Sequence, residues 1–192
     1  MSGKEDLVPR HEWPCTPEGS SPNQYGEFFI NRCAFSDKAR IFRETEYKTG
    51  HDMAESNEDF RLISALYWGE GDKNYSYFGF SNCDPTMLTL VVHWLINNGY
   101  GHRVKFTVRA FKENGRSQLA IKRWWIQQIP ALNLLEQVGP VYFNKVIRSS
   151  QRVGKNKQPN GTAYIVVGDV SLKSRVMGGI NFLKHNFFST RV

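Results

Sequence analysis

The segment "LISALYWGEGDKN", residues 62–74, combines two patterns in one short stretch of chain. Its first half has the apolar spacing of an amphipathic helix, and its second half places one carboxylate, Glu70, between Gly69 and Gly71. An acid is disfavoured at the C-terminal end of a helix, because the negative end of the helix dipole lies there. The position of Glu70 therefore indicates a role other than helix stability, and a solvated surface carboxylate is the alternative interpretation.

Helix and strand patterns alternate around this segment. Its helix is predicted from about Asn57 to Trp68, after a capping box formed by Ser56 and Asp59. The elements predicted after it are a strand at 75–82, a helix with Asp84 as N-cap and Pro85 as first residue, a strand at 102–111, a helix at 117–128, strands at 142–148 and 162–170, and a helix at 172–187. This order predicts an α+β fold, with an antiparallel β-sheet and helices packed on one of its faces.

The sequence before this helix has a different character. Residues 1–26 are rich in Pro and Gly and are predicted to be mostly irregular, while residues 27–50 have the pattern of one or two short helices. We therefore expect an N-terminal extension at 1–56 and one domain at 57–192.

The composition excludes several classes of protein. No apolar run approaches the roughly 18 residues that a membrane span requires, and the N-terminal residues lack the apolar segment of a signal peptide. Three cysteines without C-x-x-C spacing argue against a disulfide framework and a structural zinc site. We expect a soluble, intracellular protein that is not secreted and has no membrane partner.

Charge is distributed unevenly along the chain. Residues 1–60 hold 7 Lys/Arg and 12 Asp/Glu, whereas residues 61–192 hold 18 Lys/Arg and 6 Asp/Glu. A long segment with three basic groups for each acid suits a polyanionic partner, first of all nucleic acid. An ordinary basic surface remains the alternative.

The strand predicted at 102–111 shows where such a partner would bind. Its sequence alternates strictly, so that apolar residues fall on one face and polar residues on the other. The polar face consists of Arg103, Lys105, Thr107 and Arg109. This pattern predicts a strand that is covered on one side and cationic on the other, and a solvated sheet face without a ligand is the alternative.

The helix segment also resembles a known signature. "ISALYWGEG", residues 63–71, is similar to the nine-residue signature of LAGLIDADG homing endonucleases and their DNA-binding relatives. Leu66 and Gly71 match it letter for letter, and Glu70 stands where that family carries its metal-binding acid. The segment "FSNCDPTMLTLVVHWL", residues 80–95, resembles a recurrent continuation in the same family. The likeness covers about residues 57–187.

The resemblance implies a site-specific, double-stranded DNA endonuclease of homing type that depends on Mg²⁺. In that family two signature helices pack side by side, which implies a homodimer with Ala65 and Gly69 at its interface. A monomer, in which Ala65 and Gly69 are small core residues, is the alternative. The acids of the two helices then meet at the centre, so Glu70, with Gly71 beside it, is the implied metal site. Lys73 and Lys145 are the implied positive groups near the reacting phosphate.

The resemblance also implies that the sheet lies in the major groove of DNA. The residues implied to contact DNA are Arg103, Lys105, Thr107, Arg109, Lys145, Arg148, Arg152, Lys155 and Lys157. The chain departs from the family because residues 72–83 leave room for one strand where the family has two, so we expect a shortened or rearranged DNA-binding surface. Two alternatives remain open, namely a non-catalytic DNA-binding regulator on the same fold and an RNA-binding protein that uses the same basic sheet.

Overall fold

A computed structural model describes residues 26–73, 77–112, 115–144 and 158–189. The chain divides into two units, Met1–Arg43 and Glu44–Val192. Of the first unit, the described part, residues 26–43, belongs to one long helix, α1 (Gly26–Ser56). The other elements are α2 (Glu58–Glu70), β1 (Phe78–Asn82), α3 (Pro85–Asn97), η2 (Gly101–Arg103), β2 (Val104–Phe111), α4 (Gln118–Gln128), η4 (Pro130–Leu134), β3 (Gln137–Asn144), β4 (Thr162–Val167) and α5 (Val170–Ser189).

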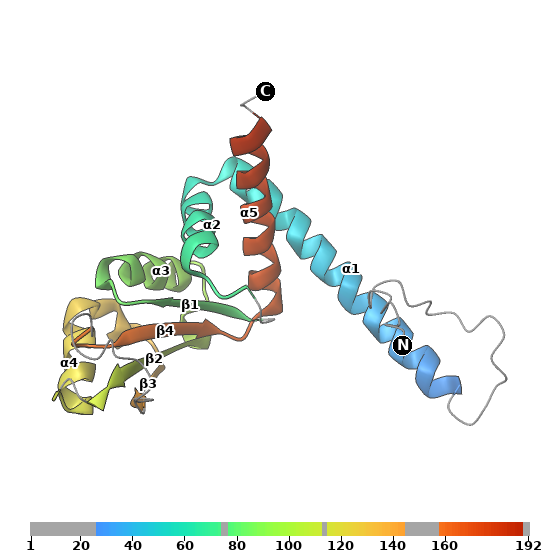
Figure 1. The fold of residues 1–192 in the computed structure, drawn as a ribbon. Coiled ribbons are helices and arrows are strands. Elements are labelled where there is room, and N and C mark those ends of the chain that lie inside the picture. The colour runs from blue at the N-terminus through green and yellow to red at the C-terminus, as the bar shows by residue number, and fades with distance from the viewer. Residues whose placement is uncertain (1–25, 74–76, 113–114, 145–157, 190–192) are drawn as a thin grey trace, which may run out of the picture. The chain divides into compact units, whose positions relative to one another are not determined.

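The predicted α+β class is confirmed, and the predicted order of helices and strands is found in the second unit (Figure 1). The four strands form one sheet in the order β1-β4-β2-β3. The prediction of an antiparallel sheet is wrong in one pairing. β4 runs antiparallel to both β1 and β2, but β3 runs parallel to β2. The chain between β2 and β3 forms α4 and η4, and such a crossover returns it to the end of the sheet from which β2 started.

Strand β3 also differs from its predicted position. It begins at Gln137, earlier than the predicted 142–148, and residues 145–148 lie outside the described part of the chain. An extra residue in β3 shifts the register between its pairings with Phe106 and Val108 of β2. This bulge contains Gly139 and Pro140. Proline is tolerated there because β3 is an edge strand, where a lost backbone donor breaks no ladder.

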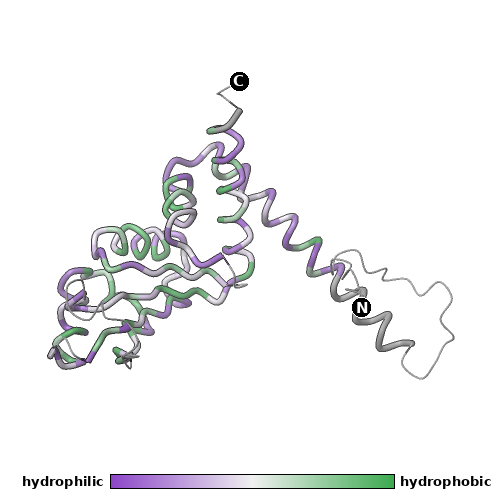
Figure 2. Tube along the Cα trace, viewed as in Figure 1, coloured by the Kyte–Doolittle hydropathy of each residue, from purple (hydrophilic) through white to green (hydrophobic). Residues whose placement is uncertain are grey.

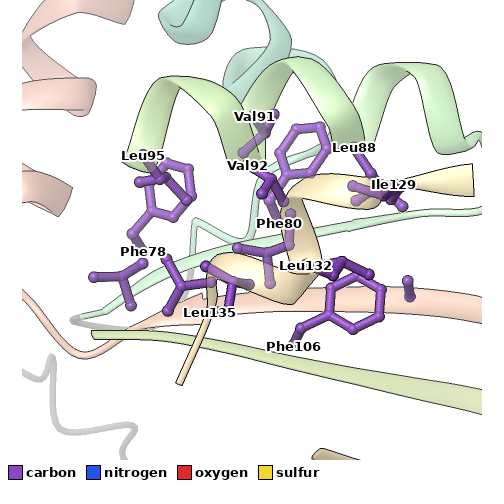
Figure 3. Close-up of a cluster of buried hydrophobic side chains, with 14 of the residues drawn as sticks. Phe78, Phe80, Leu88, Val91, Val92, Leu95, Phe106, Ile129, Leu132 and Leu135 are labelled. Carbon is purple, nitrogen blue, oxygen red and sulfur yellow. The ribbon is translucent and has the colours of Figure 1, made fainter. Parts of the chain in front are cut away.

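One face of the sheet is covered by helices, as predicted, and the described core lies between this face and the helices. Figure 3 shows this layer: Phe78, Phe80 and Phe106 from the sheet, Leu88, Val91, Val92 and Leu95 from α3, and Ile129, Leu132 and Leu135 in and beside η4. Figure 2 shows apolar residues concentrated along α3 and polar residues along α1. Each large apolar side chain buried in this layer stabilises the fold by about 1.5–3 kcal/mol.

The start of α2 corrects one predicted cap and the start of α3 confirms another. The N-cap of α2 is Asn57, whose Oδ1 accepts a hydrogen bond from the Phe60 N–H at 2.9 Å. Ser56 is still helical in α1, where its hydroxyl donates to the Asp52 carbonyl at 3.2 Å, so the predicted capping box is wrong. At α3, the Asp84 carboxylate accepts from the Thr86 N–H at 2.8 Å, with Pro85 in the first turn as predicted.

The last helix packs closely against two others within the second unit. A Cβ built on Gly178 would lie 1.9 Å from the Tyr47 carbonyl of α1, and one on Gly179 would lie 2.2 Å from the Ser64 hydroxyl of α2. The two glycines therefore allow α5 to approach α1 and α2 at backbone distance. Residues 44–56 thus belong to the same compact unit as the sheet. No helix among the described residues has the length and apolar character needed to cross a membrane.

Candidate nucleic-acid interface

The helix α2 ends at Glu70, and its carboxylate is exposed. Gly71 caps the helix in an extended conformation, with its N–H donating to the Tyr67 carbonyl at 2.9 Å. A Cβ on Gly71 would lie 2.5 Å from the Tyr67 ring and carbonyl, so glycine is required there by close contact. Gly71 also bridges to Phe80 of β1, which holds Glu70 one residue from the edge of the sheet.

Two of the three residues implied for catalysis lie in the described part of the chain. Lys73 is exposed, and its Nζ donates to the Gly71 carbonyl at 3.1 Å. The structure therefore brings Glu70, Gly71 and Lys73 together at the tip of α2. Lys145 lies outside the described residues.

A buried polar cluster supports this tip from inside. The amine of Lys173, in the first turns of α5, donates to the Tyr67 hydroxyl at 2.8 Å and to the Asp72 carbonyl at 2.6 Å. The Tyr67 hydroxyl itself donates to the Asp72 carbonyl and accepts from the Gly79 N–H at 3.4 Å. Burial raises the pKa of Tyr67 to about 12 and lowers the pKa of Lys173. These contacts tie α2, β1 and α5 together directly beneath Glu70.

Sequence reasoning missed Lys173, although its spacing gave a signal. Lys173 precedes Val176 by three residues and Ile180 by seven, so it falls on the predicted apolar face of the last helix. A lysine on an apolar face requires hydrogen-bond partners in the interior. Phe187, which was predicted on that same face, is exposed.

The tip of α2 supplies only some of the ligands that a divalent cation needs. Within the described residues, no group of three or more His, Cys, Asp or Glu side chains is positioned to bind a metal ion. The Glu70 carboxylate and the Gly71 carbonyl are hard oxygen donors of the kind Mg²⁺ prefers. Because Mg²⁺ is commonly held by one or two carboxylates together with substrate phosphates, this donor set fits half of a shared site.

The outer face of α2 is exposed near Gly69 in the described part of the chain. Leu62 is 47% exposed, and Ala65 and Gly69 are also exposed. A Cβ on Gly69 would meet no atom within 4 Å in the described structure. The opposite face of α2 buries Phe60, Ile63 and Tyr67 in the core. The helix therefore has one buried face and one exposed face of small and apolar residues.

The strand β2 presents side chains on the face of the sheet that no described helix covers. Lys105 and Arg109 are exposed and Thr107 is half-buried, and they alternate with buried residues as predicted. The predicted place of Arg103 on the strand is wrong, because Arg103 precedes β2 in the short helix η2. Its guanidinium forms an ion pair with Asp169 at 2.6 Å. The cationic face of β2 therefore begins at Lys105.

Two tyrosines that sequence reasoning did not single out lie beside Arg109. The Arg109 guanidinium lies over the ring of Tyr164 in β4, 4.9 Å from the ring centroid. Tyr142 is opposite Arg109 on β3 and is 53% exposed. Alternation in "TAYIVV" would have placed Tyr164 on the open face, whereas the position of Tyr142 depends on the parallel pairing of β3.

The remaining basic residues implied to contact DNA are not placed by the structure. Arg148, Arg152, Lys155 and Lys157, like Lys145, lie within 145–157, outside the described residues. Among the described residues, the implied duplex interface consists of the β2 cations and the acidic tip of α2, and the two tyrosines lie beside Arg109 without being part of it. No family model, curated protein or solved structure matches the chain.

Proposed function

We propose that this protein is a site-specific double-stranded DNA endonuclease of homing type, similar to LAGLIDADG homing endonucleases, that acts as a Mg²⁺-dependent homodimer. The observation that carries the proposal is the exposed Glu70 carboxylate, which the Gly71–Phe80 bridge attaches to a sheet with a cationic open face. An acid at the helix terminus that disfavours it, held at the β1 edge of a sheet whose strand β2 carries cations, fits a metal ligand at a phosphodiester.

Each chain contributes a defined set of groups in this proposal. Glu70 and the Gly71 carbonyl supply oxygen ligands, and Lys73 supplies a positive charge at the same tip. Lys105 neutralises phosphate, and Arg109 contacts a base edge in the major groove. A divalent cation, when bound, supplies positive charge beside the phosphate that is cut. A second copy of the chain, packed against Ala65 and Gly69, completes the ligand set with its own acid.

Cleavage of a randomised duplex library in the presence of Mg²⁺ tests the proposal. We expect the wild type to cut a discrete set of sequences, and Glu70→Gln to bind the same sequences without cutting them. Glu58→Gln is the matched control, because Glu58 is an exposed acid at the opposite end of the same helix. Equal cutting by wild type and Glu70→Gln would remove Glu70 from the chemistry.

The salt dependence of duplex binding tests the sheet separately. Each phosphate contact contributes about 0.9 to the slope of log affinity against log salt, so Lys105→Ala, which removes one contact from each chain of the dimer, is expected to flatten the slope by about 1.8. Arg103→Ala is the control, since the guanidinium of Arg103 is engaged by Asp169, and it is expected to change the slope less. An unchanged slope in Lys105→Ala would exclude β2 from the interface.

A non-catalytic DNA-binding regulator on the same surface is the second candidate function. The observation that favours it is the absence of a cluster of metal-ligating side chains among the described residues. In that case the library experiment gives discrete bound sequences that neither wild type nor Glu70→Gln cuts.

A further inference from the structure

The open face of the sheet carries a row of two tyrosines and one arginine that reading a duplex does not require. Tyr142, Arg109 and Tyr164 come from the neighbouring strands β3, β2 and β4. Arg109 is paired directly with Tyr142 and lies diagonally from Tyr164, which pairs with Thr107. Diagonal neighbours on one face of a sheet are within reach of long and aromatic side chains. The cation–π contact confirms that Arg109 uses this reach.

This row is accessible, and its surroundings suit a polyanion. Tyr142 and Arg109 are exposed, and Tyr164 is half-buried. The strand residues 78–82, 104–111, 137–144 and 162–167 contain no Asp or Glu. Lys105 lies on the same face of β2, four residues from Arg109. The strands themselves therefore offer a phosphate backbone cations and no carboxylate, and Glu136, directly before β3, is an acid that lines the pocket beside Lys105.

A pocket adjoins the row at the β3 bulge. It has a volume of about 190 Å³ and is lined by Lys105, Thr107, Glu136, Gln137, Val138 and Gly139. Gly139 is required beside it, since a Cβ there would lie 2.9 Å from the Thr107 methyl group. The hydroxyl of Thr107 and the amide of Gln137 can both donate and accept hydrogen bonds, as the edge of a nucleobase requires.

Stacking distinguishes unpaired bases from paired ones. In a duplex the faces of the bases are covered by their neighbours, and a protein in the groove reaches only base edges. Proteins that bind single strands instead combine a cationic track for the backbone with aromatic and Arg groups on which bases stack. The row on β3, β2 and β4 has this second composition.

We propose that Tyr142, Arg109 and Tyr164 bind the unpaired bases of single-stranded DNA, with Lys105 on the backbone. The choice of DNA over RNA rests on the proposed function, in which DNA is the substrate of the same face. The row gives the protein a second DNA-binding mode, for unpaired bases, beside its proposed contact with the duplex.

Fluorescence anisotropy with a labelled short single-stranded DNA, the RNA of the same sequence and the corresponding duplex tests this inference. Loss of one stacked base by substitution at an aromatic site costs about 1–3 kcal/mol, so Tyr142→Leu is expected to weaken single-strand binding about 5- to 150-fold. Tyr142→Phe keeps the ring and is the matched control, with an expected affinity close to that of the wild type. Duplex affinity is expected to be unchanged in both variants.

A second pair of variants tests the same inference at Tyr164, so that the conclusion does not depend on Tyr142 alone. Tyr164→Leu and Tyr164→Phe are expected to follow the same pattern, and thermal unfolding of each variant confirms that it is folded. Single-strand binding that is unchanged in both Leu variants overturns the inference, and so does an equal loss of duplex binding. Tight binding of the RNA with no binding of the DNA overturns the assignment to DNA.

The single-strand measurement needs neither Mg²⁺ nor cleavage, so it remains readable if the endonuclease proposal fails. Conversely, sequence-specific cutting by the wild type with wild-type single-strand affinity in the Leu variants would retain the proposed function and discard the stacking row.

Discussion

Lys173 is the residue on which the geometry of the acidic tip depends. An ammonium group is costly to bury unless its donors are satisfied, and here the Tyr67 hydroxyl and the Asp72 carbonyl accept from it. Both acceptors lie within the turn that carries Glu70, so satisfying the lysine also fixes that turn. The cluster is therefore a structural support for Glu70, and its own groups are buried away from a substrate.

The pKa of Tyr67 predicts how the fold responds to alkali. Because burial holds this pKa at about 12 instead of 10, the unfolded chain loses the phenol proton before the folded chain does. The contribution of the protonated Tyr67 hydroxyl to the stability of the fold is thus complete below pH 10 and is lost as pH rises from 10 to 12. Relative to Tyr67→Phe, the wild type is expected to lose on the order of 3 kcal/mol of unfolding free energy over that interval.

Urea unfolding of both proteins across that pH interval measures this difference. Lys173 acts in the opposite direction, because its lowered pKa makes the unfolded chain bind more protons, so stability rises with pH up to 10.5. Lys173→Met is therefore included to separate the two groups. Parallel pH profiles for wild type and Tyr67→Phe would contradict the assignment.

At the scale of helices and strands, local sequence patterns predicted where single elements lie better than they predicted how the strands pair. Helical and alternating periodicity located α2, α3, β2 and α4, because each element buries one face and its period reports that face. The parallel pairing of β3 was missed, although the helix predicted between the strands at 102–111 and 142–148 is the kind of connection that joins parallel strands. The alternation around Arg103 was misleading because residues 101–103 form η2 and β2 begins only at Val104, while the Arg103 guanidinium pairs with Asp169.

The candidate site divides in the same way. The exposed Glu70 tip and the cations of β2 were predicted, as both follow from residue order within one element. Lys173 beneath the tip and the row of Tyr142 and Tyr164 were not, because they arise from segments that meet only in the folded chain.

Two glycines in helices predict opposite effects on stability. Gly179→Ala places a methyl group 2.2 Å from the Ser64 hydroxyl and 3.0 Å from the Phe60 ring, where α5 contacts α2. We expect a loss of about 1–3 kcal/mol, the usual cost of overpacking. Gly69→Ala meets nothing within 4 Å and removes the entropic cost of a helical glycine, so it is expected to add about 0.5–1 kcal/mol.

Urea unfolding at a protein concentration that keeps the chain monomeric compares these variants. Ser64→Ala is expected to recover part of the loss in Gly179→Ala, because it removes the hydroxyl that the new methyl group contacts. Additive effects of the two substitutions would show that α5 shifts away from α2 instead.

At the scale of the whole molecule, the proposed cleavage reaction has one acid available from each chain. The described residues of a single chain offer Glu70 at the tip without a cluster of further ligating side chains. A two-fold axis beside α2 would bring the Glu70 of a second chain close to the first. The exposed face of α2 would then contact the same face of the partner, as in most homodimers. The exposed small residues of α2 permit such an approach, since small side chains let two helix backbones come close.

Substitution of Ala65 tests the dimer. Ala65→Glu places two like charges at the proposed axis, so we expect monomers in sedimentation velocity, loss of cutting and unchanged unfolding of the single chain. Gln127→Glu, on the exposed surface of α4, adds the same charge elsewhere and is expected to remain dimeric and active. Gly69→Ala is a further test, because its expected effect on the stability of the single chain is opposite to its expected effect on the affinity of the dimer. Its methyl group is expected to stabilise the isolated chain yet separate the paired helices, which weakens the dimer. A variant that is more stable and dimerises as tightly as the wild type would place the interface on another face of the chain.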